Sequence, residues 1–282
     1  MMSAETTLST FVASAGDNVV VQDWPVQDGI PLRGMVIVVH GLGEHAGRYD
    51  YLARHLNTWG FAVRGYDQYG HGESGGAYGS LPTDTRLLDD LTDMVDSTRA
   101  RMRKDMPLIL LGHSMGGLVA ARFVSLAIRP VDALVLSSPA FDPGLTRWQK
   151  FLLSFVPRLA PNFRVANGLN PEYLSHDPAV VAAYRADPLV HNRISARLAG
   201  FIARTGPKVL AMAPHWKVPT LLMYAGDDRL LNPLGSRRFA KAAPKSKVKA
   251  VRFDTLYHEI FNELDAVPVY ATLQRWLDRV VA

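Results

Sequence analysis

The sequence contains no cysteine, which excludes disulfide bonds and thiolate chemistry. It also lacks a long apolar run, since no stretch approaches the ~18 residues that a membrane-spanning helix needs. The N-terminal stretch MMSAETTLSTFVASAG has neither the basic region nor the apolar region of a signal peptide. From the absence of a signal peptide and of a membrane-spanning run we expect a soluble, cytoplasmic protein, whereas the absence of cysteine does not determine the compartment.

A large excess of charge of one sign is absent as well. The net charge is +5 over 282 residues, which is too small to indicate nucleic-acid binding, and no nucleic-acid-binding motif is present. Residues 141–206 hold eight Lys or Arg against four acidic residues, and residues 235–253 hold seven Lys or Arg and no acidic residue. We interpret the second stretch as a solvated helix face and turn.

Hydrophobic residues make up 48% of the chain, enough for a sizeable core. Short apolar runs rich in Val, Ile and Leu alternate with helical patterns, which predicts a wound, mostly parallel sheet flanked by helices. The predicted strands are Val19–Trp24, Met35–His40, Ala62–Tyr66, Leu108–Leu111, Ala133–Ser138, Thr220–Ala225 and Val248–Phe253. The predicted helices are Arg48–Trp59, Asp84–Arg103, Met115–Ile128, Pro233–Ala242 and Ala266–Val280.

The alternation stops between Ser138 and Thr220, where no strand-like run recurs. We predict a mostly helical insertion there, over the carboxyl edge of the sheet. In RWQKFLLSFVPRL, Pro157 should end or kink the helix. One face of this helix would carry Trp148, Leu152, Phe155 and Leu159, with Arg147, Lys150 and Arg158 nearby. This face could roof a pocket or dock on lipid, and both interpretations stay open.

The segment LILLGHSMGGLVAARF contains the pattern G-x-S-x-G from Gly112 to Gly116. The pattern stands between an apolar strand and a helical pattern, where a tight turn would push the Ser114 hydroxyl outward and leave no room for side chains at the flanking glycines. We interpret Ser114 as a nucleophile rather than as a helix cap. His113, its neighbour, is expected to line the wall of the pocket.

A serine nucleophile needs a general base, and the base needs an acid that orients it. Of the nine histidines, His258 is the predicted base because it follows the last predicted strand, whereas His40 and His71 stand in glycine turns and are interpreted as structural. The acid should follow the preceding strand. There the stretch LLMYAGDDRLLNP offers Asp227 and Asp228, and spacing alone does not choose between them.

The stretch VIVVHGLGEHAGRY, residues 36–49, places a glycine turn after a strand. Such a turn could cradle a dinucleotide phosphate, and Asp67 stands about where a ribose-binding acid would be. However, its pattern G-x-G-x-x-x-G is one residue longer than the dinucleotide fingerprint. With a nucleophile, two candidate acids and His258 present, an oxyanion hole is favoured, with the backbone N–H groups of Leu42 and Met115 as donors.

With these motifs assembled, the chain resembles the monoacylglycerol lipase and lysophospholipase branch of the α/β hydrolases. The order Ser, Asp, His is that of α/β hydrolases. The resemblance covers about residues 30–265 and is carried by HGLGEHAGRY, YDQYGHGESGG, GHSMGG, YRADPL, AGDDRL and YHEIFNE. It implies a single α/β-hydrolase domain over residues 1–282 with a helical cap inserted at residues 141–206. It also selects Asp228, which immediately precedes Arg229-Leu230, as the acid.

The resemblance further implies a polar end of the pocket, where glycerol sits. Glu44 and Arg48 match residues that shape this end, and Tyr184 matches a cap residue that reaches it. Bracing of a helix by Arg48 and simple packing of Tyr184 remain alternatives. Phe261 stands where mammalian members carry a second histidine, so we expect this end to be less polar and the preference for monoacylglycerols to be less strict.

These features predict a serine hydrolase that cleaves fatty acyl esters, above all monoacylglycerols, to free fatty acid and glycerol. No cofactor and no metal is predicted, since Asn262 stands where the second histidine of an H-E-x-x-H zinc motif would be. The alternatives are a broad carboxylesterase or lysophospholipase and, from a different class, a hydrolase-fold ligand receptor with little turnover. The predicted partners are a small lipid ester and, weakly and peripherally through the cap, an anionic membrane. Acyl length and oligomeric state are left open.

Overall fold

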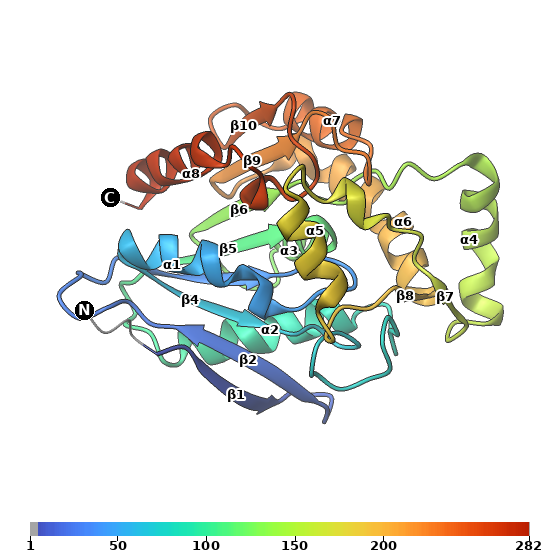
Figure 1. Ribbon diagram of the computed structural model, residues 1–282, viewed down its shortest axis with the longest axis horizontal. Coiled ribbons are helices and arrows are strands. Elements are labelled where there is room, and N and C mark those ends of the chain that lie inside the picture. The colour runs from blue at the N-terminus through green and yellow to red at the C-terminus, as the bar shows by residue number, and fades with distance from the viewer. Residues whose placement is uncertain (1–4, 282) are drawn as a thin grey trace.

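The computed structural model describes residues 5–281, except for the side chains of Arg147 and Lys150. Its main sheet has eight strands in the order β1-β2-β4-β3-β5-β6-β9-β10 (Figure 1). The strands from β4 to β10 in this order are parallel, whereas β2 is antiparallel to both of its neighbours, β1 and β4. The strands are β1 (Thr7–Val12), β2 (Asn18–Trp24), β3 (Gly34–Val39), β4 (Phe61–Tyr66), β5 (Leu108–His113), β6 (Ala133–Ser137), β9 (Thr220–Ala225) and β10 (Val248–Phe253).

Helices cover both faces of this sheet. The α-helices are α1 (Asp50–Thr58), α2 (Arg86–Arg99), α3 (Ser114–Ser125), α4 (Arg147–Leu159), α5 (Pro178–Ala186), α6 (Ala196–Met212), α7 (Leu234–Ala242) and α8 (Val267–Val280). The 3-10 helices are η1 (Ala46–Tyr49), η2 (Pro171–Tyr173), η3 (Ala213–His215) and η4 (Ile260–Asn262). In the part of the chain that the structure describes, no helix combines the length and the apolarity needed to cross a bilayer.

Strand β3 shows why the sheet is buried on both sides. Val36 and Val38 belong to the core beneath α1 and α8, whereas Ile37 and Val39 belong to the core beneath α2, α3, α6 and α7. Successive side chains of a strand point to opposite faces, so a strand covered on both faces must be apolar throughout. The predicted mostly parallel sheet with flanking helices is confirmed.

Strands β9 and β10 have the predicted bounds. Strand β1 was not predicted. Its residues are almost all exposed, so it lacks the apolar run that marked the other strands. It pairs with β2 alone, at the edge of the sheet.

Between β6 and β9 the structure has α4, α5 and α6, as predicted, and two short strands that were not predicted. These strands, β7 (Arg164–Ala166) and β8 (Arg193–Ser195), pair antiparallel. The expectation of no strand here was wrong, because three-residue strands with mainly exposed side chains carry no readable pattern. Helix α4 contains Pro157 and ends two residues after it.

Helix α4 lies at one end of the molecule and packs on α6 (Figure 1). Trp148 and Phe151 are 64% and 54% exposed and stack with ring centroids 5.4 Å apart. Leu159 is also exposed, whereas Leu152 and Phe155 are half-buried. One side of the predicted apolar face therefore packs on the protein and the other meets solvent. Arg147 and Lys150, expected nearby, have side chains outside the described part.

Candidate active site

The candidate residues gather at one edge of the sheet. Ser114 follows β5, Asp228 lies in the loop after β9, His258 lies after β10, and Leu42 lies in the turn after β3. These four strands are parallel, so their carboxyl ends lie at the same edge. In open α/β sheets this edge is where ligands bind.

Ser114 occupies a strained turn between β5 and α3. Its φ is +52°, in the left-handed region that a residue with a side chain rarely adopts. A Cβ on Gly112 would lie 2.6 Å from the carbonyl oxygen of Gly116, and a Cβ on Gly116 would lie 2.0 Å from that of Val39. Gly112 is therefore required by the tightness of this turn, and Gly116 by the close approach of the turn to the end of β3.

His258 and Asp228 form a buried pair. The His258 Nδ1 lies 2.8 Å from Asp228 Oδ2, and both side chains are only 4% exposed. The other oxygen, Asp228 Oδ1, accepts hydrogen bonds from the N–H groups of Leu230 and Leu231, which fix the carboxylate. Burial alone would lower the pKa of His258, but Asp228, with smaller contributions from Glu259 and Glu44, holds this pKa above its usual value.

Hydrogen bonds between its own residues fix the conformation of the turn after β3. The Gly41 N–H donates to Glu44 Oε1, and His40 Nδ1 lies 2.8 Å from the Gly41 carbonyl oxygen. His40 Nε2 accepts from the Gln68 N–H, so Nδ1 carries the proton and donates to Gly41. Among residues 5–281 the Leu42 N–H has no hydrogen-bond acceptor. It is thus available for a ligand next to Ser114.

A small cavity brings most of the predicted residues together. Its wall contains Gly41, Leu42, Glu44, Arg48, His113, Ser114, Leu169, Leu174, Tyr184, Leu230, Leu231, His258 and Glu259. The four leucines at 169, 174, 230 and 231 were not predicted. Two of them follow Asp228 closely in the sequence, and that proximity was the one signal that could have identified them. These leucines make one part of the wall apolar, whereas Glu44 and Arg48 make another part charged.

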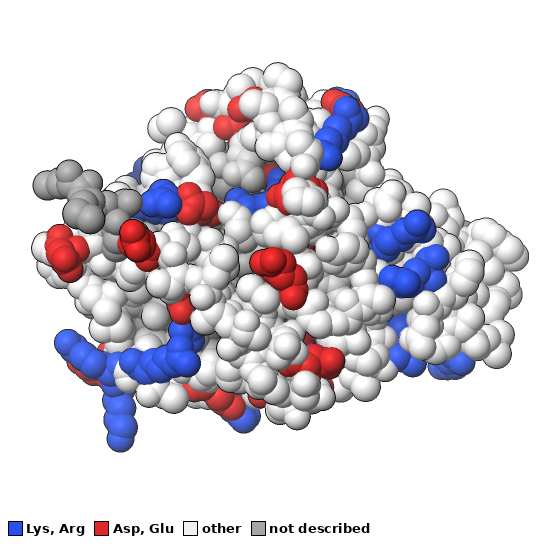
Figure 2. All heavy atoms as spheres, turned by 60° about the horizontal axis from the view of Figure 1, so that its bottom comes forward, with Lys and Arg blue, Asp and Glu red and all other residues white. Residues whose placement is uncertain are grey.

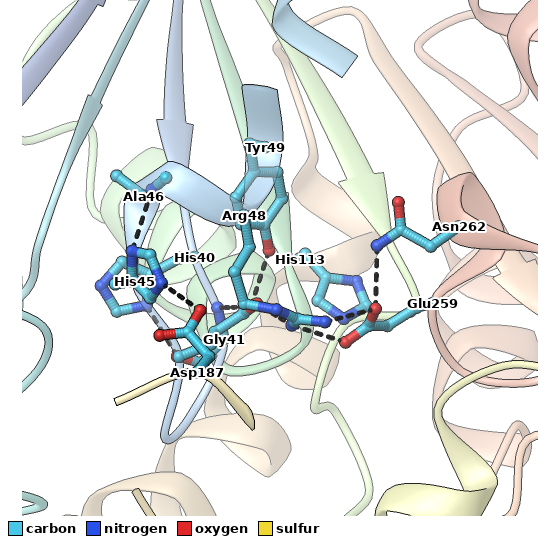
Figure 3. A network of polar contacts seen from close by, with 12 residues as sticks. His40, Gly41, His45, Ala46, Arg48, Tyr49, His113, Asp187, Glu259 and Asn262 are labelled. Atoms are coloured by element: carbon cyan, nitrogen blue, oxygen red, sulfur yellow. Dashed lines mark hydrogen bonds and ion pairs between the residues drawn. The ribbon is translucent and has the colours of Figure 1, made fainter. Parts of the chain in front are cut away.

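Arg48 is held by two carboxylates and an aromatic ring, and Figure 3 shows its pairing with Glu259. Its guanidinium donates to Glu44 Oε2 at 2.5 Å and to both oxygens of Glu259 at 2.7 and 2.9 Å. Its Cζ lies 4.7 Å from the centroid of the Tyr184 ring. Burial alone would raise the pKa of the Glu44 carboxyl, but Arg48 and His113 lower it to about 2. Glu44 and Arg48 are therefore both ionised at neutral pH.

Two further predicted residues lie beside this cluster. Burial and the neighbouring His258 lower the pKa of His113 to about 4, so its ring is neutral at physiological pH. Phe261 is buried on η4 against Tyr270, with ring centroids 5.4 Å apart. It borders a second cavity, which shares Glu44, Arg48, His113 and Glu259 with the first but does not include Ser114.

The sheet, its flanking helices and the order of the loops around Ser114 are those of an α/β hydrolase. Residues 30–265 match the family described as serine aminopeptidase, S33, and the chain belongs to this family, in the monoacylglycerol lipase branch of the α/β hydrolases.

Three comparisons illustrate the relationship. The monoacylglycerol lipase of Mycolicibacterium smegmatis is 32% identical over 98% of this chain and 99% of its own. The crystal structure of Paleococcus ferrophilus monoacylglycerol lipase is 31% identical, covers 98% of this chain and 100% of its own, and has a TM-score of 0.81. A soluble variant of monoglyceride lipase from Saccharomyces cerevisiae, in complex with a substrate analog, shares the fold at a TM-score of 0.88 and 23% identity, covering 99% of this chain and 96% of its own.

Proposed function

We propose that this protein is a serine hydrolase that cleaves monoacylglycerols to free fatty acid and glycerol. The observation that carries the proposal is the pairing of His258 with Asp228 beside Ser114 on its strained turn. A buried histidine oriented by a carboxylate, next to an outward-facing serine, is the arrangement that activates a serine hydroxyl. Two relatives that are matched over nearly their full length and named as monoacylglycerol lipases support the substrate class.

In the proposed mechanism Ser114 Oγ attacks the ester carbonyl carbon while His258 Nε2 takes its proton. The backbone N–H groups of Leu42 and Met115 stabilise the negative oxygen of the tetrahedral intermediate. His258 then returns the proton to the leaving glycerol oxygen, which leaves an acyl ester on Ser114. Water, deprotonated by His258, attacks this ester; the second tetrahedral intermediate then collapses, His258 returns the proton to Ser114 Oγ, and the fatty acid is released. Throughout, Asp228 keeps Nδ1 protonated and stabilises the imidazolium.

We assign the apolar wall of the cavity to the acyl chain and the polar wall to glycerol. Leu169, Leu174, Leu230 and Leu231 supply the apolar side, and Glu44, Arg48 and Tyr184 the polar side. Donors and acceptors at the polar side would favour a substrate with free hydroxyls over one without them, because a simple ester leaves those groups unpaired.

We propose that residues 141–206 form a cap over this site. Tyr184, Leu169 and Leu174 come from this segment and line the cavity that holds Ser114. The two ends of the segment meet, since a Cβ on Gly206 would lie 2.2 Å from the Phe141 carbonyl oxygen. A second and third acyl chain would have to pass this roof, so diacylglycerols and triacylglycerols should be poor substrates.

We also propose weak, peripheral contact of the cap with anionic membranes. The stacked and exposed Trp148 and Phe151 offer an apolar anchor at one end of the molecule. In Figure 2 basic side chains flank a largely uncharged surface at the end where Figure 1 places α4. Aromatic side chains next to cations bind the interface of anionic bilayers.

The proposed activity is tested by Ser114→Ala and a substrate panel. The panel compares kcat/KM for a monoacylglycerol, a diacylglycerol, a lysophospholipid and the methyl ester of the same fatty acid. Ser114→Ala should lower turnover by roughly 10³-fold or more and abolish fluorophosphonate labelling while leaving Tm unchanged.

Each outcome of these tests discriminates among the candidates. A Ser114→Ala variant that keeps a tenth of the activity would contradict the role of Ser114. Diacylglycerol turnover as fast as monoacylglycerol turnover would contradict the substrate class. Preference for the lysophospholipid would favour the lysophospholipase alternative, and absence of turnover on the whole panel would favour the receptor alternative.

A further inference from the structure

We propose that Glu259 is a positioning residue. Through Arg48 and Glu44 it fixes the position of the loop that carries His258 relative to the turn after β3 that carries the Leu42 N–H, here called the oxyanion turn. The proposal rests on the proposed hydrolase activity. Glu259 directly follows the histidine, and Glu44 bonds the turn that carries Leu42. Neither the nucleophile pattern nor the histidine's position in the sequence assigns a task to Glu259.

The connection is a continuous chain of short contacts (Figure 3). Glu259 receives two hydrogen bonds from Arg48, at 2.7 and 2.9 Å. Arg48 also donates to Glu44 Oε2, and Glu44 Oε1 accepts from the Gly41 N–H. The chain of contacts thus runs from the residue beside the base to the residue beside the Leu42 donor. It joins segments 211 residues apart in the sequence.

Each member of this chain is held from several sides, which makes it rigid. The Glu259 side chain is 5% exposed and the Arg48 side chain 11%. Asn262 Nδ2 donates to Glu259 Oε2, and the Tyr49 hydroxyl donates to Glu44 Oε1. A bidentate guanidinium–carboxylate pair fixes orientation as well as distance, and burial excludes the water that would otherwise compete for it.

Arg48 would keep one anchor if Glu259 were neutral. Its bond to Glu44 would still hold the oxyanion turn, whereas the His258 side of the connection would be weakened. The backbone N–H of Glu259 donates to the Leu174 carbonyl oxygen, so the loop itself stays attached. Loss of the side-chain charge should therefore displace or loosen the base without removing the pocket, and lower kcat more than it raises KM.

The same chain of contacts, Glu259, Arg48 and Glu44, also determines the charge around His258. The charged or titratable groups around His258 are Asp228 from the loop after β9, Glu259 from its own loop, Glu44 from the turn after β3, Arg48 from η1 and His113 from β5. Asp228 raises the pKa of His258 most, and Glu259 and Glu44 add to that effect. Neutralising Glu259 should lower this pKa, so His258 would stay unprotonated, and competent as a base, to lower pH.

The decisive experiment compares Glu259→Gln and Glu259→Asp with the wild type on one soluble ester. We expect Glu259→Gln to lower kcat about 10-fold, with KM nearly unchanged, and to move the acidic limb of kcat/KM to lower pH. Glu259→Asp keeps the charge, so its acidic limb should stay near that of the wild type. A wild-type kcat in Glu259→Gln would overturn the proposal, because the connection through Arg48 would then position nothing on which turnover depends.

Asp23→Asn is the matched control. Asp23 also forms a bidentate pair, with the buried Arg64 at 2.7 and 2.9 Å, but between β2 and β4 and outside the cavity. It should lower Tm and leave kcat, KM and the pH profile unchanged. If Glu259→Gln behaves like Asp23→Asn, Glu259 is only a structural residue and the proposal fails.

A double-mutant cycle with Arg48→Gln tests the connection itself. If Glu259 acts through Arg48, adding Glu259→Gln to Arg48→Gln should lower kcat little further, whereas additive losses would show that Glu259 does not act through Arg48. Ser114→Ala, measured on the same ester, distinguishes a failure of the proposed function from a failure of the proposed role of Glu259. An active Ser114→Ala overturns the proposed function, whereas an inactive one beside a wild-type-like Glu259→Gln overturns only the role of Glu259.

Discussion

His258 Nδ1 lies 2.8 Å from Asp228 Oδ2, whereas the adjacent Asp227 turns away from the histidine. The Asp227 side chain is 47% exposed and pairs with Arg229 at the surface. Two neighbouring carboxylates thus have opposite environments, and only one of them can stabilise a protonated base in a buried site.

Asp228→Asn should therefore cost far more activity than Asp227→Asn. We expect a loss of roughly 10³-fold to 10⁴-fold for Asp228→Asn, because an amide neither stabilises the imidazolium nor holds the required tautomer. Asp227→Asn should change kcat by less than about 2-fold, since an exposed pair contributes little. Steady-state kinetics on one ester decides this, and equal losses would contradict the choice of Asp228.

The acidic limb of the pH profile should have its midpoint above 6.5, the ordinary histidine value. His258 must be unprotonated to accept the proton of Ser114, so kcat/KM should rise as pH passes through its raised pKa. A midpoint at or below 6.5 in a profile of kcat/KM would show that burial outweighs Asp228.

The same pair links stability to pH. The pKa of His258 is raised in the folded state. Its contribution to the free energy of unfolding is therefore complete below pH 6.5 and is lost as the pH rises through the pKa of the folded state. Burial would raise the pKa of Asp228, but His258 chiefly lowers it. The contribution of Asp228 to the free energy of unfolding is therefore present above pH 3.8 and is lost as the pH falls through the pKa of the folded state. Asp228→Asn should consequently reduce Tm more at about pH 5.5 than at about pH 9. Thermal unfolding at the two pH values measures this difference.

Phe261→His should raise the ratio of monoacylglycerol to methyl ester turnover. The new ring would border the cavity that also contains Arg48 and Glu259, and it could reach a glycerol hydroxyl there. Burying imidazole in place of the phenyl ring against Tyr270 should lower the free energy of unfolding by roughly 1–3 kcal/mol. An unchanged ratio, measured on a variant shown by Tm to be folded, would place Phe261 outside the glycerol end.

Replacing Trp148 and Phe151 together by Ser should reduce co-sedimentation with anionic vesicles. Both side chains are exposed, so their loss removes apolar anchors and little internal packing. Added salt should weaken wild-type binding, because the attraction of the cap's cations to the lipid is screened. Hydrolysis of a soluble ester should be nearly unchanged in this variant and serves as the control. Absence of wild-type binding at low salt would contradict the proposed membrane contact.

Most of the fold could be predicted because its signals are local. Buried parallel strands are continuous apolar runs, and the tight turn at Ser114 requires a glycine at Gly112, where a Cβ would meet the Gly116 carbonyl oxygen of the same turn. By contrast, β1, β7 and β8 are short or exposed, so their pairing depends on neighbouring strands more than on their own residues.

For the candidate site, the sequence by itself determined the residue types, their order and the strand ends on which they stand. The tertiary structure showed that Asp228, which the family resemblance had selected, meets His258 while Asp227 pairs with Arg229, and that Phe261 borders the second cavity. It also joined Glu259 to Arg48 across 211 residues. The reason is physical: a loop's direction and a buried ion pair depend on what packs around them, and the surrounding groups come from strands that are distant in the chain and adjacent only in the folded sheet.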